Sequence, residues 1–105
     1  MVEINRGDSA EMIEAVRCWT GWGDSAMPTR NDDRLLARFG DERGATLLSE
    51  IKRLEEEFYL SDANLVAADM QDMARRCAED FKRKRPEIAD EIVNAFVWCY
   101  TFDYK

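Results

Sequence analysis

Residues 91–102, "EIVNAFVWCYTF", form the most apolar stretch of the chain and decide its fold. Apolar residues recur in and around this stretch at helical spacing and cover roughly half the circumference of a helix. A helix with so wide an apolar face must contact several others, so we expect one from Pro86 to about Thr101 at the centre of the molecule. Its apolar face consists of Ile88, Ile92, Val93, Ala95, Phe96, Val97, Cys99, Tyr100 and Phe102.

The same segment also suits a β-strand, because residues 97–104 are rich in aromatic residues, and "MVEIN" at residues 1–5 offers a second strand. A lone pair of strands is marginally stable, so we prefer the helix. Two prolines and five glycines in 105 residues favour a few long elements. The expected fold is all-α: one domain over residues 1–105, a compact bundle of four or five helices around a central C-terminal helix.

Three helices are expected in the first half of the chain. The first covers residues 7–19, with Asp8 as its cap and Glu11 as the capping-box partner. The second runs from about Asn31 to Phe39, is capped by Thr29 or Asn31, and ends at Gly40. The third covers about residues 42–59, with a narrow apolar seam at helical spacing. That seam consists of Leu47, Ile51, Leu54 and Phe58.

A fourth helix, the longest, is expected from Ser61 as its cap to about Arg85. Leu60 and Leu65 occupy the positions of a hydrophobic staple at its start. Pro86 ends this helix and starts the next one. Its buried side is expected to contain Val66, Met70, Met73, Cys77 and Phe81.

The charge balance points away from nucleic acid and anionic membranes. Lysine and arginine number 15 against 22 aspartates and glutamates, for a net charge of −7. A phosphate backbone is repelled by such a field, and so is an anionic lipid surface. An acidic protein is better suited to a basic protein partner, although acidity that serves solubility alone is the alternative.

The residues for most catalytic chemistry are missing, and we expect no catalytic, cofactor-binding or metal-binding residues. The chain has no histidine, and Cys18, Cys77 and Cys99 are far apart, without a Cys-x-x-Cys pair. A polar N-terminus and short apolar runs predict a reduced, cytoplasmic protein, with secretion without a classical signal as the alternative. A small helical enzyme that uses carboxylates alone is the remaining catalytic alternative.

Two tryptophans are candidate contacts for a partner. Trp98 falls on the polar side of its helix together with Glu91, and Trp22 stands beside glycines, off the apolar line of its own helix. Tryptophan is enriched among the residues that dominate binding energy at interfaces. The alternative is structural: the loop at residues 21–28 covers Trp98.

Asp69 and Asp72 belong to an acidic strip on the fourth helix and are the other candidate contacts. The strip suits docking on a basic surface. The alternative is that four-residue ion pairs on the same helix neutralise it. The strip contains Asp62, Asp69, Asp72, Glu79 and Asp80, and the pairs would be Asp72–Arg76, Glu79–Arg83 and Asp80–Lys84.

In size, acidity, expected location and surface tryptophans, the chain resembles small bacterial immunity proteins of contact-dependent growth-inhibition systems. The resemblance implies a non-catalytic monomer or homodimer that binds and neutralises a cognate toxin, typically a basic nuclease. Trp98, Glu91, Asp69, Asp72 and Trp22 are then the expected contacts. The alternative function is a helical adaptor or regulatory subunit of a cytoplasmic complex.

Overall fold

The computed structural model describes residues 2–104, and their side chains from residue 10 onward. Within this range the chain forms six α-helices and no strand, which confirms the predicted all-α class. Residues 2–5, the alternative strand, belong to the first helix. The helices are α1 (Val2–Thr20), α2 (Asp32–Phe39), α3 (Asp41–Phe58), α4 (Ala63–Val66), α5 (Met70–Lys84) and α6 (Asp90–Asp103).

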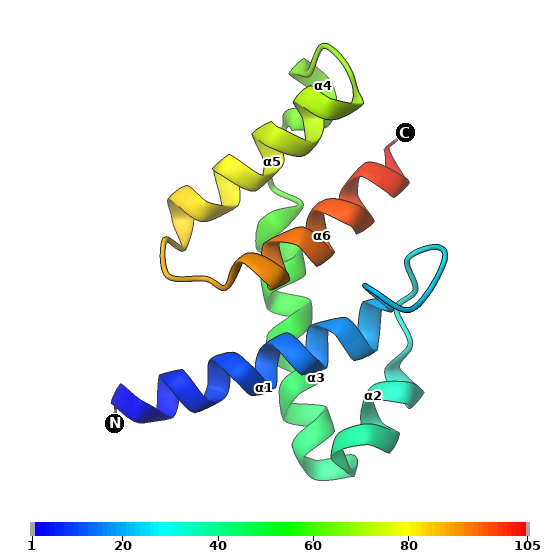
Figure 1. The fold of residues 1–105 in the computed structure, drawn as a ribbon, viewed down its shortest axis with the longest axis vertical. Coiled ribbons are helices and arrows are strands. Elements are labelled where there is room, and N and C mark those ends of the chain that lie inside the picture. The colour runs from blue at the N-terminus through cyan, green and yellow to red at the C-terminus, as the bar shows by residue number, and fades with distance from the viewer. Residues whose placement is uncertain (1, 105) are drawn as a thin grey trace.

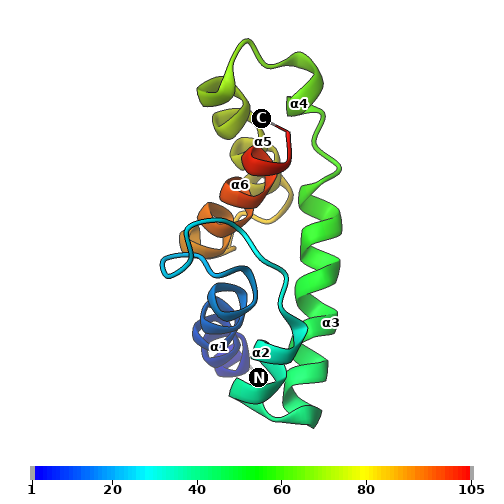
Figure 2. The same cartoon turned by 90° about the vertical axis from the view of Figure 1, so that its right-hand side faces the viewer.

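The helices form two layers, seen face-on in Figure 1 and edge-on in Figure 2. Helices α1, α6 and α5 lie side by side in one layer, and α3 runs behind them along the long axis, with α2 against its first turns. The molecule measures 42 × 32 × 19 Å. Its short dimension matches two helices of about 10 Å each. Helix α6 lies between α1 and α5, in the predicted central place.

The core lies between these layers and consists mainly of aromatic side chains. The predicted seam of α3 is buried along its whole length, and it ends at Phe58. The Phe58 ring lies 5.0 Å from the ring of Phe81, 5.7 Å from Phe96 and 5.8 Å from Tyr100, measured between centroids. Tilted and edge-on aromatic pairs at such distances are favourable beyond the area they bury. The contacts join α3 to both α5 and α6.

Helix α2 begins as predicted, whereas α1 does not. The Asn31 side chain accepts a hydrogen bond from the Arg34 N–H at 2.9 Å, while Thr29 donates to the Trp19 carbonyl instead. Helix α1 starts at Val2, so the predicted start near Gly7 and the cap at Asp8 are wrong. Residues 2–7 contain no proline, and a single glycine inside a helix costs only about 1 kcal/mol. Nothing in them stops the helix.

The predicted fourth helix is wrong, because it is broken after a single turn. Helix α4 ends at Val66, and α5 starts at Met70. At the break, Asp69 accepts from the Asp72 N–H at 2.8 Å and Asp72 accepts from the Ala68 N–H at 3.0 Å. This reciprocal capping satisfies backbone donors that an uncapped helix start leaves without partners. It fixes a new helix start at residue 70.

Helix α6 begins later than predicted. Residues 85–89 form a turn in which the Ile88 N–H donates to the Arg85 carbonyl at 3.0 Å, and the first helical residue is Asp90. Pro86 therefore does not start α6. Pro86 does end α5, whose last residue is Lys84. Arg85, the residue before the proline, is disfavoured in helical conformation.

Candidate functional site

Most of the large apolar side chains that remain exposed belong to α4 or to the segments next to it in the chain, and α4 lies at one end of the molecule (Figure 1). Six large apolar side chains are exposed among the described residues, and one of them, Met27, belongs to the loop after α1. We call the other five the α4 surface. It consists of Leu60, Leu65, Val66, Met70 and Tyr104, which are 73%, 80%, 52%, 41% and 44% exposed.

The exposure of these residues corrects the sequence-based prediction. Leu60 and Leu65 do not form a staple, and Val66 and Met70 are not on a buried side. A staple requires a helix that continues past its first turn, and α4 stops after four residues. Predicted burial is confirmed only beyond the break, at Met73, Cys77 and Phe81.

The backbone of the α4 surface is held in place from below by a buried hydroxyl group. The Tyr100 hydroxyl accepts from the Asn64 N–H at 3.0 Å and lies within donating distance of the Ser61 carbonyl, at 2.9 Å. The Tyr100 hydroxyl thus joins the end of α6 to α4, and the Tyr104 ring packs on the Tyr100 ring at 4.8 Å, one turn further along. Ser61 also donates to Asp80 on α5, at 2.6 Å. The exposed apolar side chains thus project from a fixed backbone.

Carboxylates without a basic partner flank this surface. Glu56, Asp62 and Asp69 are exposed and form no ion pair with any described residue. Within the described part of the chain, the Asp69 carboxylate accepts a hydrogen bond only from the start of its own helix. The nearest bases along the chain, Arg75 and Arg76, are already engaged by Asp72, at 2.5 and 2.9 Å. The α4 surface is therefore apolar with a negative rim.

The Asp72 carboxylate stabilises the start of α5, and its charge is not free for a partner. Its pKa lies well below the usual range, first because the carboxylate accepts the Ala68 N–H, and then because Arg76 and Arg75 donate to it. The predicted ion pair of Asp72 with Arg76 is confirmed. The carboxylate stays ionised, but two guanidinium groups balance its charge.

The other two predicted ion pairs are wrong. Glu79 pairs with Arg75 rather than Arg83, and Asp80 pairs with Arg83 rather than Lys84. The Ser61 hydroxyl holds one oxygen of Asp80, and the other oxygen faces Arg83 one turn away. Tertiary contact thus selects the partners along α5.

The two candidate tryptophans contact each other. The rings of Trp22 and Trp98 lie 5.3 Å apart at an interplanar angle of 55°, and both are partly buried. The loop after α1 therefore covers Trp98, which was the structural alternative. Glu91, on the same helix as Trp98, is exposed and lies 3.6 Å from Arg17 on α1. We call Trp22, Trp98, Glu91 and Arg17 the tryptophan surface.

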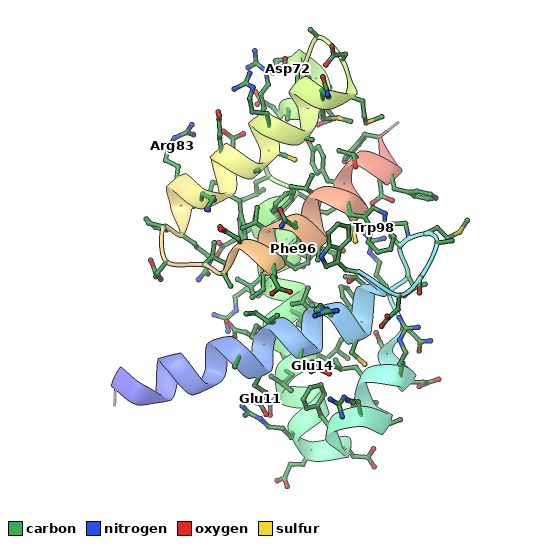
Figure 3. All side chains as sticks on the ribbon, viewed as in Figure 1. Glu11, Glu14, Asp72, Arg83, Phe96 and Trp98 are labelled. Atoms are coloured by element: carbon green, nitrogen blue, oxygen red, sulfur yellow. The ribbon has the colours of Figure 1, made fainter. Side chains whose placement is uncertain are left out.

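The five predicted contacts therefore divide between two places. Trp22, Trp98 and Glu91 lie where α1, its following loop and α6 meet, whereas Asp69 and Asp72 lie at the start of α5. Figure 3 shows the separation between Trp98 and Asp72. The sequence analysis missed the apolar part of the second place. The Asp69-x-x-Asp72 spacing, a capping signal, could have revealed it by ending the long helix early.

A groove of about 470 Å³ lies between α1, α3 and the turn at residues 85–89. Its lining combines apolar side chains, such as Met12, Leu47 and Ile92, with Arg43 and Arg85. Both guanidinium groups are already engaged, Arg43 by Glu11 and Arg85 by Glu57. The charges of these two side chains are thus balanced within the protein, whereas Glu87, which also lines the groove, forms no ion pair with a described residue.

The described residues hold no group of three or more potential ligands that could bind a metal ion. Burial raises the pKa of Cys77 and of Cys99 to about 12, so both thiols stay protonated and weakly nucleophilic near neutral pH. In the same part of the chain, none of the helices combines the length and apolar character needed to cross a membrane.

No family model, curated protein or solved structure matches the chain.

Proposed function

We propose that this chain is a non-catalytic protein-binding module, and specifically an immunity-type inhibitor that binds and neutralises a basic toxin of the nuclease type. One observation carries the proposal: the negative charge is largely uncompensated within the protein. Among the described basic residues only Lys84 and Arg34 form no ion pair, whereas eight described carboxylates form none. Those carboxylates are Asp24, Asp33, Asp41, Glu42, Glu56, Asp62, Asp69 and Glu87.

Such a charge distribution supports rapid capture of a basic partner. Complementary fields raise association rates from about 10⁵–10⁶ towards 10⁸–10⁹ M⁻¹s⁻¹ at low salt. A nuclease needs a basic groove for its substrate. An acidic protein bound in or beside that groove blocks the substrate without chemistry of its own. The proposal places the protein in the cytoplasm, where its three free cysteines stay reduced.

Affinity capture from the native cell, followed by activity measurements, tests this proposal. We expect a basic partner whose nucleic-acid cleavage stops when one equivalent of this protein is added. The association rate should fall steeply as salt rises, because salt screens charges over about 8–10 Å at ordinary ionic strength. An acidic or neutral partner with a salt-independent association rate would contradict the proposal. A basic partner without inhibited activity would support the adaptor alternative instead.

A further inference from the structure

Resting on the proposed function, we infer that the α4 surface is where the partner docks, and that it takes an apolar segment of the partner flanked by lysines and arginines. The inference assigns both a place and a chemistry to the contact. It depends on the apolar exposure, the charge and the rigidity of this end of the molecule.

The exposed apolar side chains are concentrated at and beside α4, where they contribute little to the stability of the fold. Leu65 and Val66 are neighbours on one helical turn and are 80% and 52% exposed, and Leu60 just before α4 is 73% exposed. Single exposed leucines are ordinary on monomeric proteins, but contiguous apolar patches mark interaction sites. A partner that covers these side chains removes apolar area from water, which is favourable.

The charges around the patch select the partner's chemistry. Asp62 lies between Leu60 and α4, Asp69 adjoins Met70, and Glu56 stands one turn before Leu60. None of the three carboxylates forms an ion pair within the described side chains. Lysine and arginine at the edge of an apolar contact would neutralise them, whereas acidic residues there would be repelled.

The tryptophan surface is less suited to docking of a partner than the α4 surface. The Trp22 and Trp98 rings already bury area against each other, and Arg17 lies close to Glu91. Much of the apolar area and charge of that surface is thus satisfied within the protein. On the α4 surface, by contrast, Leu60 and Leu65 are mostly exposed, and Glu56, Asp62 and Asp69 form no ion pair with a described residue.

The backbone under the α4 surface is also preorganised. The Tyr100 hydroxyl, the Ser61–Asp80 hydrogen bond and the capping by Asp69 fix it from three sides. A fixed backbone loses less conformational entropy when a partner binds. Only the exposed side chains must be ordered.

Synthetic peptides test the chemistry without the natural partner. Three peptides of about 18 residues are long enough to form helix and share one amphipathic pattern. The first has leucine on the apolar face and lysine on the charged face. The second replaces lysine by glutamate, and the third replaces leucine by serine. Each is titrated into the full-length ¹⁵N-labelled protein while amide chemical shifts are followed. We expect the leucine–lysine peptide to shift residues 60–70 and to bind about tenfold or more tighter than the other two.

Variants of the protein supply the matched control. Leu65→Ser with Val66→Ser should weaken the leucine–lysine peptide by about tenfold or more, while Met27→Ser, at an exposed apolar residue in another loop, should leave binding unchanged. Thermal unfolding monitored by circular dichroism verifies that all variants stay folded. Amide shifts at residues 60–70 locate the contact independently of the variants.

Several results would overturn the inference. These are shifts centred on Trp22 and Trp98, equal affinity for the leucine–glutamate peptide, or binding to neutral phosphatidylcholine vesicles through residues 60–70. Self-association in sedimentation experiments that the double variant abolishes would instead assign the surface to a second copy. If the peptide binds elsewhere while a captured basic toxin is still inhibited, only this inference fails. If it binds here but no captured partner is inhibited, the proposed function fails.

Discussion

Helices α4 and α6 are both rich in apolar residues and touch each other, yet one is exposed and the other is buried. Phe96 of α6 is fully buried, whereas Leu65 of α4 is 80% exposed. Helix α6 has 14 residues, enough for a continuous apolar face against two neighbours, whereas the four residues of α4 make one turn. Burial thus depends on the length of helix over which an apolar pattern continues. The apolar side chains of α4 remain exposed to solvent or to a partner.

The largest effect is expected from Phe96→Ala, which breaks the buried side of this comparison. The Phe96 ring contacts Phe58 and Phe81, and truncating a buried phenylalanine typically costs about 3–5 kcal/mol. Domains are stable by only about 5–15 kcal/mol, so the variant should be severely destabilised. Denaturant unfolding measures the change. A loss below about 1 kcal/mol would show that α6 is peripheral.

Tyr100→Phe should remove the hydrogen bonds that join α6 to α4 while keeping the aromatic ring in place. The variant leaves the Asn64 N–H and the Ser61 carbonyl without the hydroxyl, at a cost of about 1–3 kcal/mol. Amide hydrogen exchange at residues 62–66 should become faster. Tyr104→Phe is the matched control, because the Tyr104 hydroxyl makes no hydrogen bond to the described residues. Equal exchange rates in both variants would contradict the anchoring of α4 by Tyr100.

Asp69→Ala tests the break that shortens α4. The Asp69 carboxylate caps α5, and loss of such a cap costs about 0.5–2 kcal/mol. Asp62→Ala should cost much less, since Asp62 precedes α4 without a side-chain capping bond. Chemical denaturation compares the two. If both variants lost the same stability, charge rather than capping would be the cause.

Acid should loosen the same junction at a lower pH than an ordinary aspartate would suggest. Because the pKa of Asp72 is lowered in the folded state, its contribution to stability is complete above its unfolded value of about 3.9. That contribution disappears as pH falls through the lower, folded value. The effect should be smaller than the previous ones, because salt and water screen exposed pairs. A pH series of unfolding experiments should show a shallower acid decline for Asp72→Asn than for the wild type.

Leu65→Ser should leave stability almost unchanged, within about 0.5 kcal/mol, because the side chain is largely in solvent. The measured midpoint of denaturation should match that of the wild type. A loss above about 1 kcal/mol would mean that Leu65 packs against the protein in solution and that the contrast with α6 is not real.

Periodicity predicted the buried half of the molecule because the core depends on patterns that the sequence repeats. The seam ending at Phe58 and the face containing Ile92 and Phe96 are buried as expected. The break before α5 was not predicted, because Ser61 and Asp69 are both good caps of similar strength. Both caps are used in the structure: the Ser61 hydroxyl accepts the Ala63 N–H at 3.2 Å while it donates to Asp80, and Asp69 starts a second helix at residue 70.

The surroundings of the candidate contacts were predicted less well than the core, because they depend on residues far apart in the chain. A helical wheel correctly separates Trp98 from the apolar face, but it contains no information about the loop that covers it. Arg34 ties both ends of that loop together, because it donates to the carbonyls of Cys18 and Trp19 at the end of α1 and to the Thr29 hydroxyl after the loop. Such contacts join residues far apart in the chain, so local spacing does not reveal them.

The contact between Trp22 and Trp98 also makes the protein its own optical probe. Two indole chromophores 5.3 Å apart and tilted by 55° couple their excited states, which produces paired bands of opposite sign in the ultraviolet circular dichroism spectrum. The third tryptophan, Trp19, is buried and donates to Asp32 through its ring N–H at 2.8 Å. One chromophore of the pair belongs to the loop and the other to α6. The amplitude of the paired bands therefore reports, without any label, whether the loop is seated on the helix.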